Sequence, residues 1–165
     1  MDKFDLALLK ELQASTSVST EVLGGNVGLS ASACQRRIKK MKARGLIQKE
    51  VAILDSGKFP RLTTVIVEVV LDSGGEKALD DIIDRFTRED HVQQLYYTSG
   101  DVDFVAIFIV DGMSQFDELS RRLLMADPNI KKFHSRVVIQ SNKVTSALPL
   151  DSYRPAGPKS DPYLT

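Results

Sequence analysis

The chain has 165 residues, of which 42% are hydrophobic, and its formal net charge is zero. Its single cysteine, Cys34, excludes an internal disulfide, and no apolar run approaches the ~20 residues that a membrane-spanning helix needs. The N-terminal segment carries acids where a secretory signal needs basic residues. We therefore expect a soluble cytoplasmic protein with no membrane partner.

The zero net charge hides an uneven distribution. Residues 1–50 hold nine basic and five acidic side chains, a net of +4, whereas the rest holds thirteen basic and seventeen acidic ones, a net of −4. A chain of this length can bury one good core or two small ones. The charge distribution favours two domains, a basic head and an acidic body.

Three short helices are predicted at the N-terminus. An amphipathic stretch covers residues 5–13, and a second short one covers residues 20–27. A turn with Gly28 follows, and then Ser30, whose hydroxyl can cap a new helix. Three helices in this order, with a basic one last, form the smallest DNA-reading module, the helix-turn-helix.

The third helix is the most informative segment of the chain. Residues 30–45 carry six basic residues and no acid, which is the electrostatic footprint of a helix that binds the nucleic-acid backbone. Cys34, Ile38 and Met41 recur at spacings of four and three, so they predict a narrow buried stripe. In that stripe Cys34 is a small buried hydrophobe rather than a reactive thiol. The alternative is an ordinary amphipathic helix with a solvated basic face, but the two helices before it favour DNA.

The second half alternates between strand and helix patterns. A strand is predicted over residues 48–54, and a loop with Gly57 and Pro60 follows it. The remaining elements are then a strand at 63–71, a helix at 76–88, strands at 92–98 and 102–110, a helix at 114–125 and a strand at 133–140. The order βαββαβ is the ferredoxin-like arrangement, so the predicted fold class is α+β.

Such a sheet has both helices on one face, and the chain has no further element to cover the other. We expect this face to meet a second copy, and a homodimer would also present two basic helices together. After Leu150 the tail is rich in proline and without periodicity, which predicts disorder over residues 151–165.

The chain resembles the Lrp/AsnC family, the leucine-responsive or feast/famine transcription regulators of bacteria and archaea. The likeness covers roughly residues 2–150 and is carried by DLALLKELQ at 5–13, VGLSASACQRRIKKMKARGLI at 27–47, GDVDF at 100–104 and SALPL at 146–150. The resemblance implies a helix-turn-helix DNA-binding domain (1–47), a hinge strand and linker (48–62), and a ligand-binding and oligomerisation domain (63–150). It also implies dimers that assemble into tetramers or octamers, and DNA binding modulated by a small molecule, usually an amino acid.

By the same resemblance, double-stranded DNA is bound by the third helix. Ser32, Gln35 and Arg36 would approach base edges, and Arg37, Lys39 and Lys40 would hold phosphates. We count Ser30, at the start of this helix, with the DNA-binding residues.

The family's effector turn has the form Gly-x-x-Asp followed by an aromatic residue, and Gly100, Asp103 and Phe104 occupy it. A glycine turn leaves backbone N–H groups for a carboxylate, and an acid such as Asp103 can pair with an α-ammonium. Asp101 belongs to the same turn, and Ser135 is a candidate from the neighbouring subunit. The alternative is that both acids are simply polar hairpin residues.

Two other interpretations compete with a regulator. Sirohaem-type decarboxylases share this two-domain build, but His91 and His134 stand alone, and we find no metal spacing or nucleophile motif. We therefore predict no catalytic residue, metal or cofactor. An effector-sensing protein that has lost DNA binding is suggested only by Gly24 and Gly25, because each interior glycine costs a helix about 1 kcal/mol. These glycines predict a weak second helix.

Overall fold

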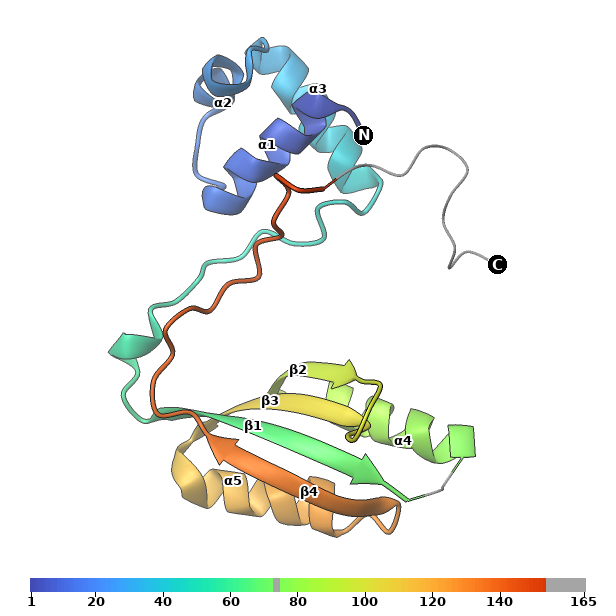
Figure 1. Cartoon of the computed structure of the whole chain (residues 1–165). Helices are drawn as coiled ribbons and strands as arrows, with labels where there is room; N and C mark the ends of the chain where they lie inside the picture. Colours follow the sequence, from blue (N-terminus) through green and yellow to red (C-terminus); the bar gives the residue numbers. More distant parts are fainter. Residues whose placement is uncertain (73–74, 154–165) are drawn as a thin grey trace. The chain divides into compact units, whose positions relative to one another are not determined.

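The computed structural model describes residues 1–72 and 75–153. The chain forms two compact units, as its charge distribution predicts (Figure 1). One consists of Met1–Ile53 and the chain from Val144 onward, and the other of Leu54–Lys143. The residues from Val144 to Leu150 thus belong with the N-terminal unit, whereas the sequence placed them in the second domain. Of the tail that we expected to be disordered, residues 154–165 lie outside the described part.

The first unit is a bundle of three helices: α1 (Lys3–Ala14), α2 (Thr20–Val27) and α3 (Ala31–Ala43). Each begins at a side chain that accepts backbone N–H groups of the first turn, namely Asp2, Ser19 and Ser30. The apolar stripes of the three helices meet in one small core, which includes the predicted stripe of α3. Its buried members are Leu8, Leu23, Cys34 and Met41.

One of the two glycines in α2 has a structural reason. A Cβ on Gly24 would lie 2.4 Å from the carbonyl oxygen of Leu29, because the turn after α2 folds back closely and the Leu29 N–H donates to the Gly24 carbonyl at 2.9 Å. Gly28 in that turn has φ +72°. A Cβ on Gly25 would meet no atom within 4 Å. Gly24 therefore allows the close turn between α2 and α3, and Gly25 is not required by packing.

The strand predicted over residues 48–54 is not formed. This segment has no ladder partner in the described chain, and only a short turn of helix, η1 (Ser56–Lys58), precedes the sheet. Val51, Ile53 and Leu54 are 69%, 86% and 68% exposed. A pattern of β-branched and apolar residues gives a strand only where a neighbouring strand accepts its hydrogen bonds.

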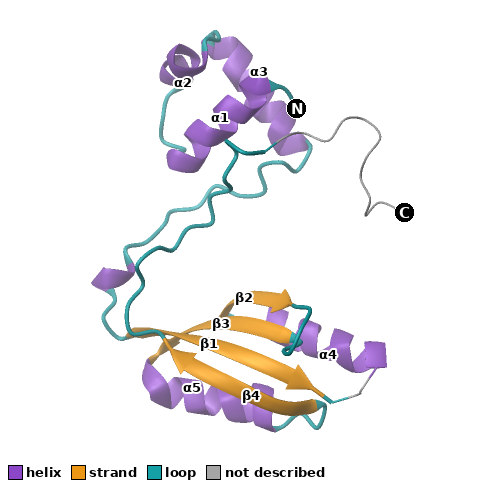
Figure 2. Cartoon of the chain, viewed as in Figure 1, coloured by secondary structure: helices purple, strands orange, loops and turns teal. Residues whose placement is uncertain are grey.

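The second unit has the predicted βαββαβ order (Figure 2). Its sheet has the strand order β2-β3-β1-β4, and the three pairings β2–β3, β3–β1 and β1–β4 are antiparallel, which is the ferredoxin-like arrangement. The last helix changes to a π-helical turn in its final part, labelled η2. The bounds are β1 (Leu62–Leu71), α4 (Gly75–Thr87), β2 (Val92–Tyr97), β3 (Phe104–Asp111), α5 (Gly112–Ser120), η2 (Arg121–Met125) and β4 (Ile130–Val137).

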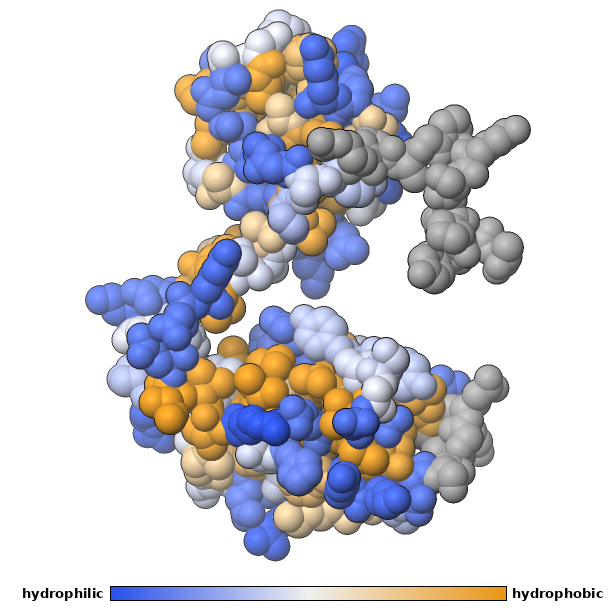
Figure 3. Space-filling view, in the orientation of Figure 1, coloured by the Kyte–Doolittle hydropathy of each residue, from blue (hydrophilic) through white to orange (hydrophobic). Residues whose placement is uncertain are grey.

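The two faces of this sheet differ in cover. Alternate residues of the central strands are buried beneath the helices: Val65, Val67, Val69, Phe104, Ala106, Phe108 and Val110. The residues between them, such as Ile66 and Ile107, point to the opposite face and are half-buried. Figure 3 shows apolar atoms gathered over the strands on this face, with hydrophilic ones between them. The predicted uncovered apolar face is therefore present.

Among residues 1–72 and 75–153, no helix combines the length and apolar character that crossing a membrane requires. The same residues contain no cluster of three histidine, cysteine or acidic side chains that could hold a metal ion.

Candidate DNA-binding surface and effector turn

The outer face of α3 is polar, cationic and open to solvent. Its buried stripe of Cys34 and Met41 faces the core, so the side chains on the opposite side of the helix point away from the unit. Five of the predicted DNA-binding residues lie there and are exposed: Ser32, Gln35, Arg36, Lys39 and Lys40. The sixth, Ser30, caps the helix with its hydroxyl, which accepts from the Ala33 N–H at 3.3 Å and lies 3.2 Å from the hydroxyl of Ser32.

Three cations on this face have no acidic partner within the described residues. Arg36, Lys39 and Lys40 form no ion pair there. Lys42, by contrast, pairs with Glu50 at 2.7 Å. An unpaired exposed cation can neutralise a phosphate without first breaking an internal contact, so this surface has the chemistry of a DNA-backbone contact.

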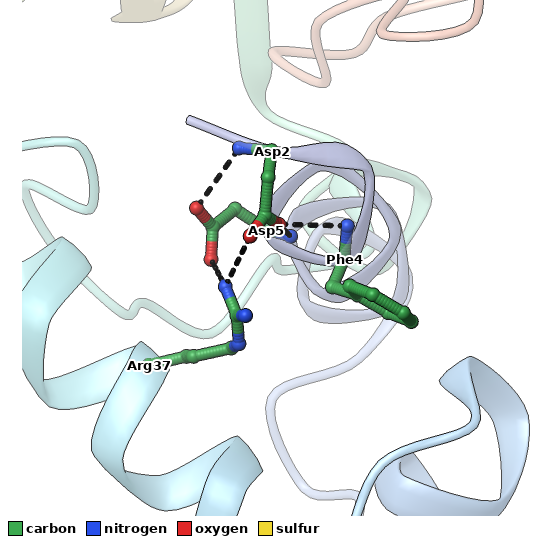
Figure 4. A network of polar contacts seen from close by, with 4 residues as sticks. All are labelled: Asp2, Phe4, Asp5 and Arg37. Atoms are coloured by element: carbon green, nitrogen blue, oxygen red, sulfur yellow. Dashed lines mark hydrogen bonds and ion pairs between the residues drawn. The ribbon is translucent and has the colours of Figure 1, made fainter.

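Arg37 lies on the same helix but turns toward α1 (Figure 4). Its guanidinium donates to Asp5 at 2.7 Å and to Asp2 at 2.8 Å, and it lies 5.6 Å from the ring centre of Phe4. The two carboxylates raise the pKa of Arg37, and the backbone N–H of Asp5 is the main cause that lowers the pKa of Asp2.

This geometry changes the interpretation of Arg37. We predicted that it holds a DNA phosphate, but two carboxylates already neutralise its charge, and its side chain is only 28% exposed. Asp2 and Asp5 also form the capping box of α1. Arg37 therefore joins α3 to the N-terminus of α1 and fixes the position of α3 in its unit.

The predicted effector turn connects β2 to β3. Gly100 has φ +120°, a conformation that side chains rarely adopt. The turn is closed by Thr98, whose N–H donates to the Asp103 carbonyl at 2.8 Å and whose hydroxyl donates to the Val102 carbonyl at 2.7 Å. The backbone conformation therefore requires glycine at this position.

Asp103 and Phe104 hold the turn onto the sheet. One carboxylate oxygen of Asp103 accepts the Leu71 N–H at 2.8 Å, and its own N–H donates to the Val69 carbonyl at 2.9 Å. Phe104 is 1% exposed, and its ring lies 5.3 Å from that of Tyr97. We predicted Phe104 as an effector residue; its side chain belongs to the core instead, because alternation along β3 places it beneath the helices.

Other groups of the turn remain available to a ligand. The backbone N–H groups of Gly100, Asp101 and Val102 have no acceptor among the described residues, and the Asp101 carboxylate is exposed and without a partner there. Among residues 1–72 and 79–153, no group donates a hydrogen bond to the second carboxylate oxygen of Asp103. Ser135 lies on the edge strand β4, which β1 separates from the β2–β3 pair. The chain itself therefore does not bring Ser135 to the turn.

Sequence reasoning missed the residues that position these sites. Asp2 and Asp5 have a readable signal, because an acid at the N-cap and another three residues later is a capping-box pattern. The contact of Asp103 with the backbone of Leu71 has no signal, since any residue other than proline can supply an N–H group.

A helix-turn-helix with a cationic outer face, joined to a ferredoxin-like unit with a glycine turn, is the architecture of a two-domain DNA-binding protein. Two family models match in the same order along the chain. Residues 1–42 match the AsnC-type helix-turn-helix domain, and residues 64–148 match the Lrp/AsnC ligand binding domain.

Individual relatives and solved structures agree with these two family models. The chain is 37% identical over 157 residues to an uncharacterized HTH-type transcriptional regulator of Sinorhizobium fredii, covering 92% of this chain and 89% of that one. The crystal structure of an AsnC family transcriptional regulator from Agrobacterium tumefaciens is 31% identical with a TM-score of 0.84, covering 92% of this chain and 98% of that one. A transcriptional regulator from Neisseria meningitidis, in complex with L-Met, is 22% identical with a TM-score of 0.83, covering 92% and 97%.

The chain belongs to the Lrp/AsnC family. It is a DNA-binding transcriptional regulator with a ligand-binding domain.

Proposed function

We propose that this regulator binds specific DNA sequences through the outer face of α3, and that an amino acid bound at the Gly100 turn alters its DNA binding or its assembly. The single observation that carries the proposal is the contrast between the unpaired cations of α3 and the paired charges around them. Ser32, Gln35 and Arg36 face base edges, Lys39 and Lys40 face phosphates, and Ser30 lies at the end of the helix that approaches the duplex. Arg37 orients the helix.

The polar groups of the Gly100 turn are complementary to the α-carboxylate and the α-ammonium that all amino acids share. The backbone N–H groups of Gly100, Asp101 and Val102 can donate to an α-carboxylate. The carboxylates of Asp101 and Asp103 can accept from an α-ammonium, and a charge-assisted hydrogen bond is stronger than a neutral one. The L-Met complex of the Neisseria meningitidis regulator supports an amino-acid ligand for this domain type.

The uncovered face of the sheet supports a homodimer as the smallest stable species. Ile66, Val70, Val105, Ile107 and Ile109 share this face, and a monomer would leave them as one apolar patch. Glu68 and Arg136 form an ion pair of 2.6 Å on the same face, and Arg136 is the main cause that lowers the pKa of Glu68. Further assembly to tetramers or octamers, with Ser135 of one copy near the turn of another, belongs to the same proposal.

Sedimentation tests the dimer. Ile107→Glu places a charge in the apolar patch, so we expect it to shift the protein toward monomers. The control is the same change at Ile139, which is fully exposed outside the sheet. A folded wild-type monomer at micromolar concentration would contradict the dimer.

Calorimetric titration with the twenty amino acids tests the ligand. Asp103→Asn is sharper than Asp103→Ala, because an amide oxygen still accepts the Leu71 N–H while the negative charge is lost. We expect one or a few amino acids to bind the wild type, and binding to be lost in Asp103→Asn. Glu118→Gln, an exposed acid on α5, is the matched control and should bind as the wild type does.

An amino acid that binds wild type and Asp103→Asn with equal affinity would place the effector site elsewhere. DNA binding without any change on adding amino acids would leave the recognition surface intact and refute the effector half of the proposal. The two halves are thus separable, because a ligand alters DNA affinity only through its different affinity for two states of the protein.

A further inference from the structure

The C-terminal part of the described chain returns to the helix-turn-helix unit. After β4 ends, the Val138 N–H donates to the Thr64 carbonyl at 2.9 Å, and from Val144 onward the chain belongs to the first unit. The helix-turn-helix unit is therefore built from both ends of the chain. We refer to Ser146–Asp151 as the strap.

Two hydrogen bonds between the Gln13 side chain and the Leu148 backbone hold the strap. The side-chain oxygen of Gln13 on α1 accepts the Leu148 N–H at 2.6 Å, and the Gln13 amide donates to the Leu148 carbonyl at 3.1 Å. One helical turn earlier, Lys10 forms an ion pair with Asp151. A side-chain amide that pairs with both the N–H and the carbonyl of one residue makes the hydrogen bonds that a neighbouring β-strand would make. It therefore fixes the register of the bound segment.

Apolar side chains of the strap and of the three-helix bundle lie on either side of a groove beside these bonds. Leu148 and Leu150 of the strap line a groove of about 610 Å³ with Leu9 and Leu12 of α1 and Ile47 beyond α3. Leu9, Leu12 and Ile47 also pack against the small core of the unit. The strap thus lies over the side of α1 that the three-helix bundle leaves partly uncovered.

The helix α1, which holds the strap, also contacts α3. The N-terminal carboxylates of α1, Asp2 and Asp5, hold Arg37 of α3, while its later residues Lys10 and Gln13 hold the strap. We infer that α1 carries a peptide-binding surface whose occupant is the chain's own strap, and that the docked strap positions α1 and α3 for DNA binding. Because the strap is continuous with β4, it also connects the ligand-binding domain to this surface.

A truncation series tests the surface. A chain that ends at Lys143 lacks the strap, and a chain that ends at Tyr153 retains it. We expect a synthetic peptide of residues 144–153 to bind the shorter chain and not the longer one, whose surface is occupied. A peptide with Leu148→Asp and Leu150→Asp should not bind. If the shorter chain keeps its helical circular dichroism and takes up neither peptide, the inference is wrong.

A full-length variant tests the same contact without truncation. Gln13→Leu removes both hydrogen bonds at similar volume, so we expect hydrogen exchange at the Leu148 amide to rise by about tenfold. Gln140→Leu is the control, because the Gln140 side chain makes no hydrogen bond within the described residues. Affinity for a short duplex of random sequence should fall severalfold in Gln13→Leu only.

Unchanged exchange at Leu148 would show that Gln13 does not hold the strap. Faster exchange with unchanged DNA affinity would refute the positioning role. Absence of DNA binding by the wild type would instead refute the proposed function, so failure of the proposed function is distinct from failure of the strap.

Discussion

The outer face of α3 and the Gly100 turn both carry charged residues, but they differ in whether those residues already have partners within the chain. Arg36, Lys39 and Lys40 have no acidic partner among the described residues. In the turn, Asp103 already accepts the Leu71 N–H, and Phe104 is buried. An unpaired group on a rigid element is available to a partner, whereas a paired group first positions its neighbours. Arg37 shows the difference within a single helix, because Asp2 and Asp5 hold it while Arg36 beside it is unpaired in the described chain.

The largest expected effect comes from removing the unpaired charges. Changing Arg36, Lys39 and Lys40 together to Gln should weaken duplex binding roughly 100-fold and lower the salt dependence by about 0.9 in log–log slope for each phosphate that is no longer neutralised. Fluorescence anisotropy over a salt series measures both. The same charge loss at Lys58, Lys131 and Lys143, in the second unit, should leave the slope unchanged. Equal slopes for the two triple variants would show that the unpaired cations of α3 contribute no more to DNA binding than lysines of the second unit.

Glu89 in the second unit contrasts with the unpaired cations of α3, because its carboxylate pairs with both Arg122 and His91. Burial alone would raise its pKa, but hydrogen bonds from Arg122 and His91 outweigh burial and lower the pKa to about 2. Because the folded pKa lies below the unfolded value near 4.5, this carboxylate stabilises the fold above pH 4.5, and the stabilisation is lost as pH falls toward 2. The shift corresponds to about 3 kcal/mol.

Urea unfolding at pH 7 and pH 3, followed by tyrosine fluorescence, to which Tyr96 and Tyr97 of the second unit contribute, measures this effect. Glu89→Gln should lower the unfolding free energy at pH 7 and reduce its decrease toward pH 3, whereas Asp2, Glu68 and Asp127, whose pKa values are also lowered, keep their share of that decrease. Glu118→Gln is the control and should keep the wild-type pH dependence. If Glu89→Gln keeps it as well, the paired carboxylate is not the source.

Arg36 and Arg37 allow an unpaired and a paired cation to be compared within one helix, α3. Arg36→Ala should relax sequence preference by about 1–3 kcal/mol if it contacts a guanine edge, with the melting temperature unchanged. Arg37→Ala should lower the melting temperature of the helix-turn-helix unit, because Asp2 and Asp5 lose their shared partner. Binding to specific and random duplexes, together with thermal melts, separates the two effects. Equal loss of affinity on specific and random DNA for Arg36→Ala would assign it to phosphates.

The smallest expected effects concern the paired glycines of α2. Gly24→Ala should destabilise the unit by roughly 1–3 kcal/mol, because the new Cβ would overlap the Leu29 carbonyl oxygen. Gly25→Ala should stabilise it by about 0.5–1 kcal/mol, because the added methyl meets open space in a helix. Thermal melts of the two variants measure both changes. Effects of the same sign would show that the turn does not depend on Gly24.

Much of this fold is readable from sequence, because it rests on periodicity and local capping. The stripe of Cys34 and Met41, and the alternation along β1 and β3, predict the buried faces. Contacts between distant segments leave no local signal: Gln13 and Leu148 are 135 residues apart. The packing reason for Gly24 is also absent from the local pattern, because it is the approach of the Leu29 carbonyl through the turn. The outer face of α3 followed from charge pattern, but the exception of Arg37 depends on where α1 packs.

A genomic footprint tests at once whether the unpaired face of α3 reads DNA and whether an amino acid controls this binding. The wild type should protect a limited set of imperfect palindromes, with half-sites about 10–10.5 bp apart or a multiple of that spacing. Occupancy should change when an amino-acid mixture is added. The variant with Gln at positions 36, 39 and 40 should lose these sites. Identical footprints for the two proteins, or occupancy that is unchanged by the mixture, would contradict the account.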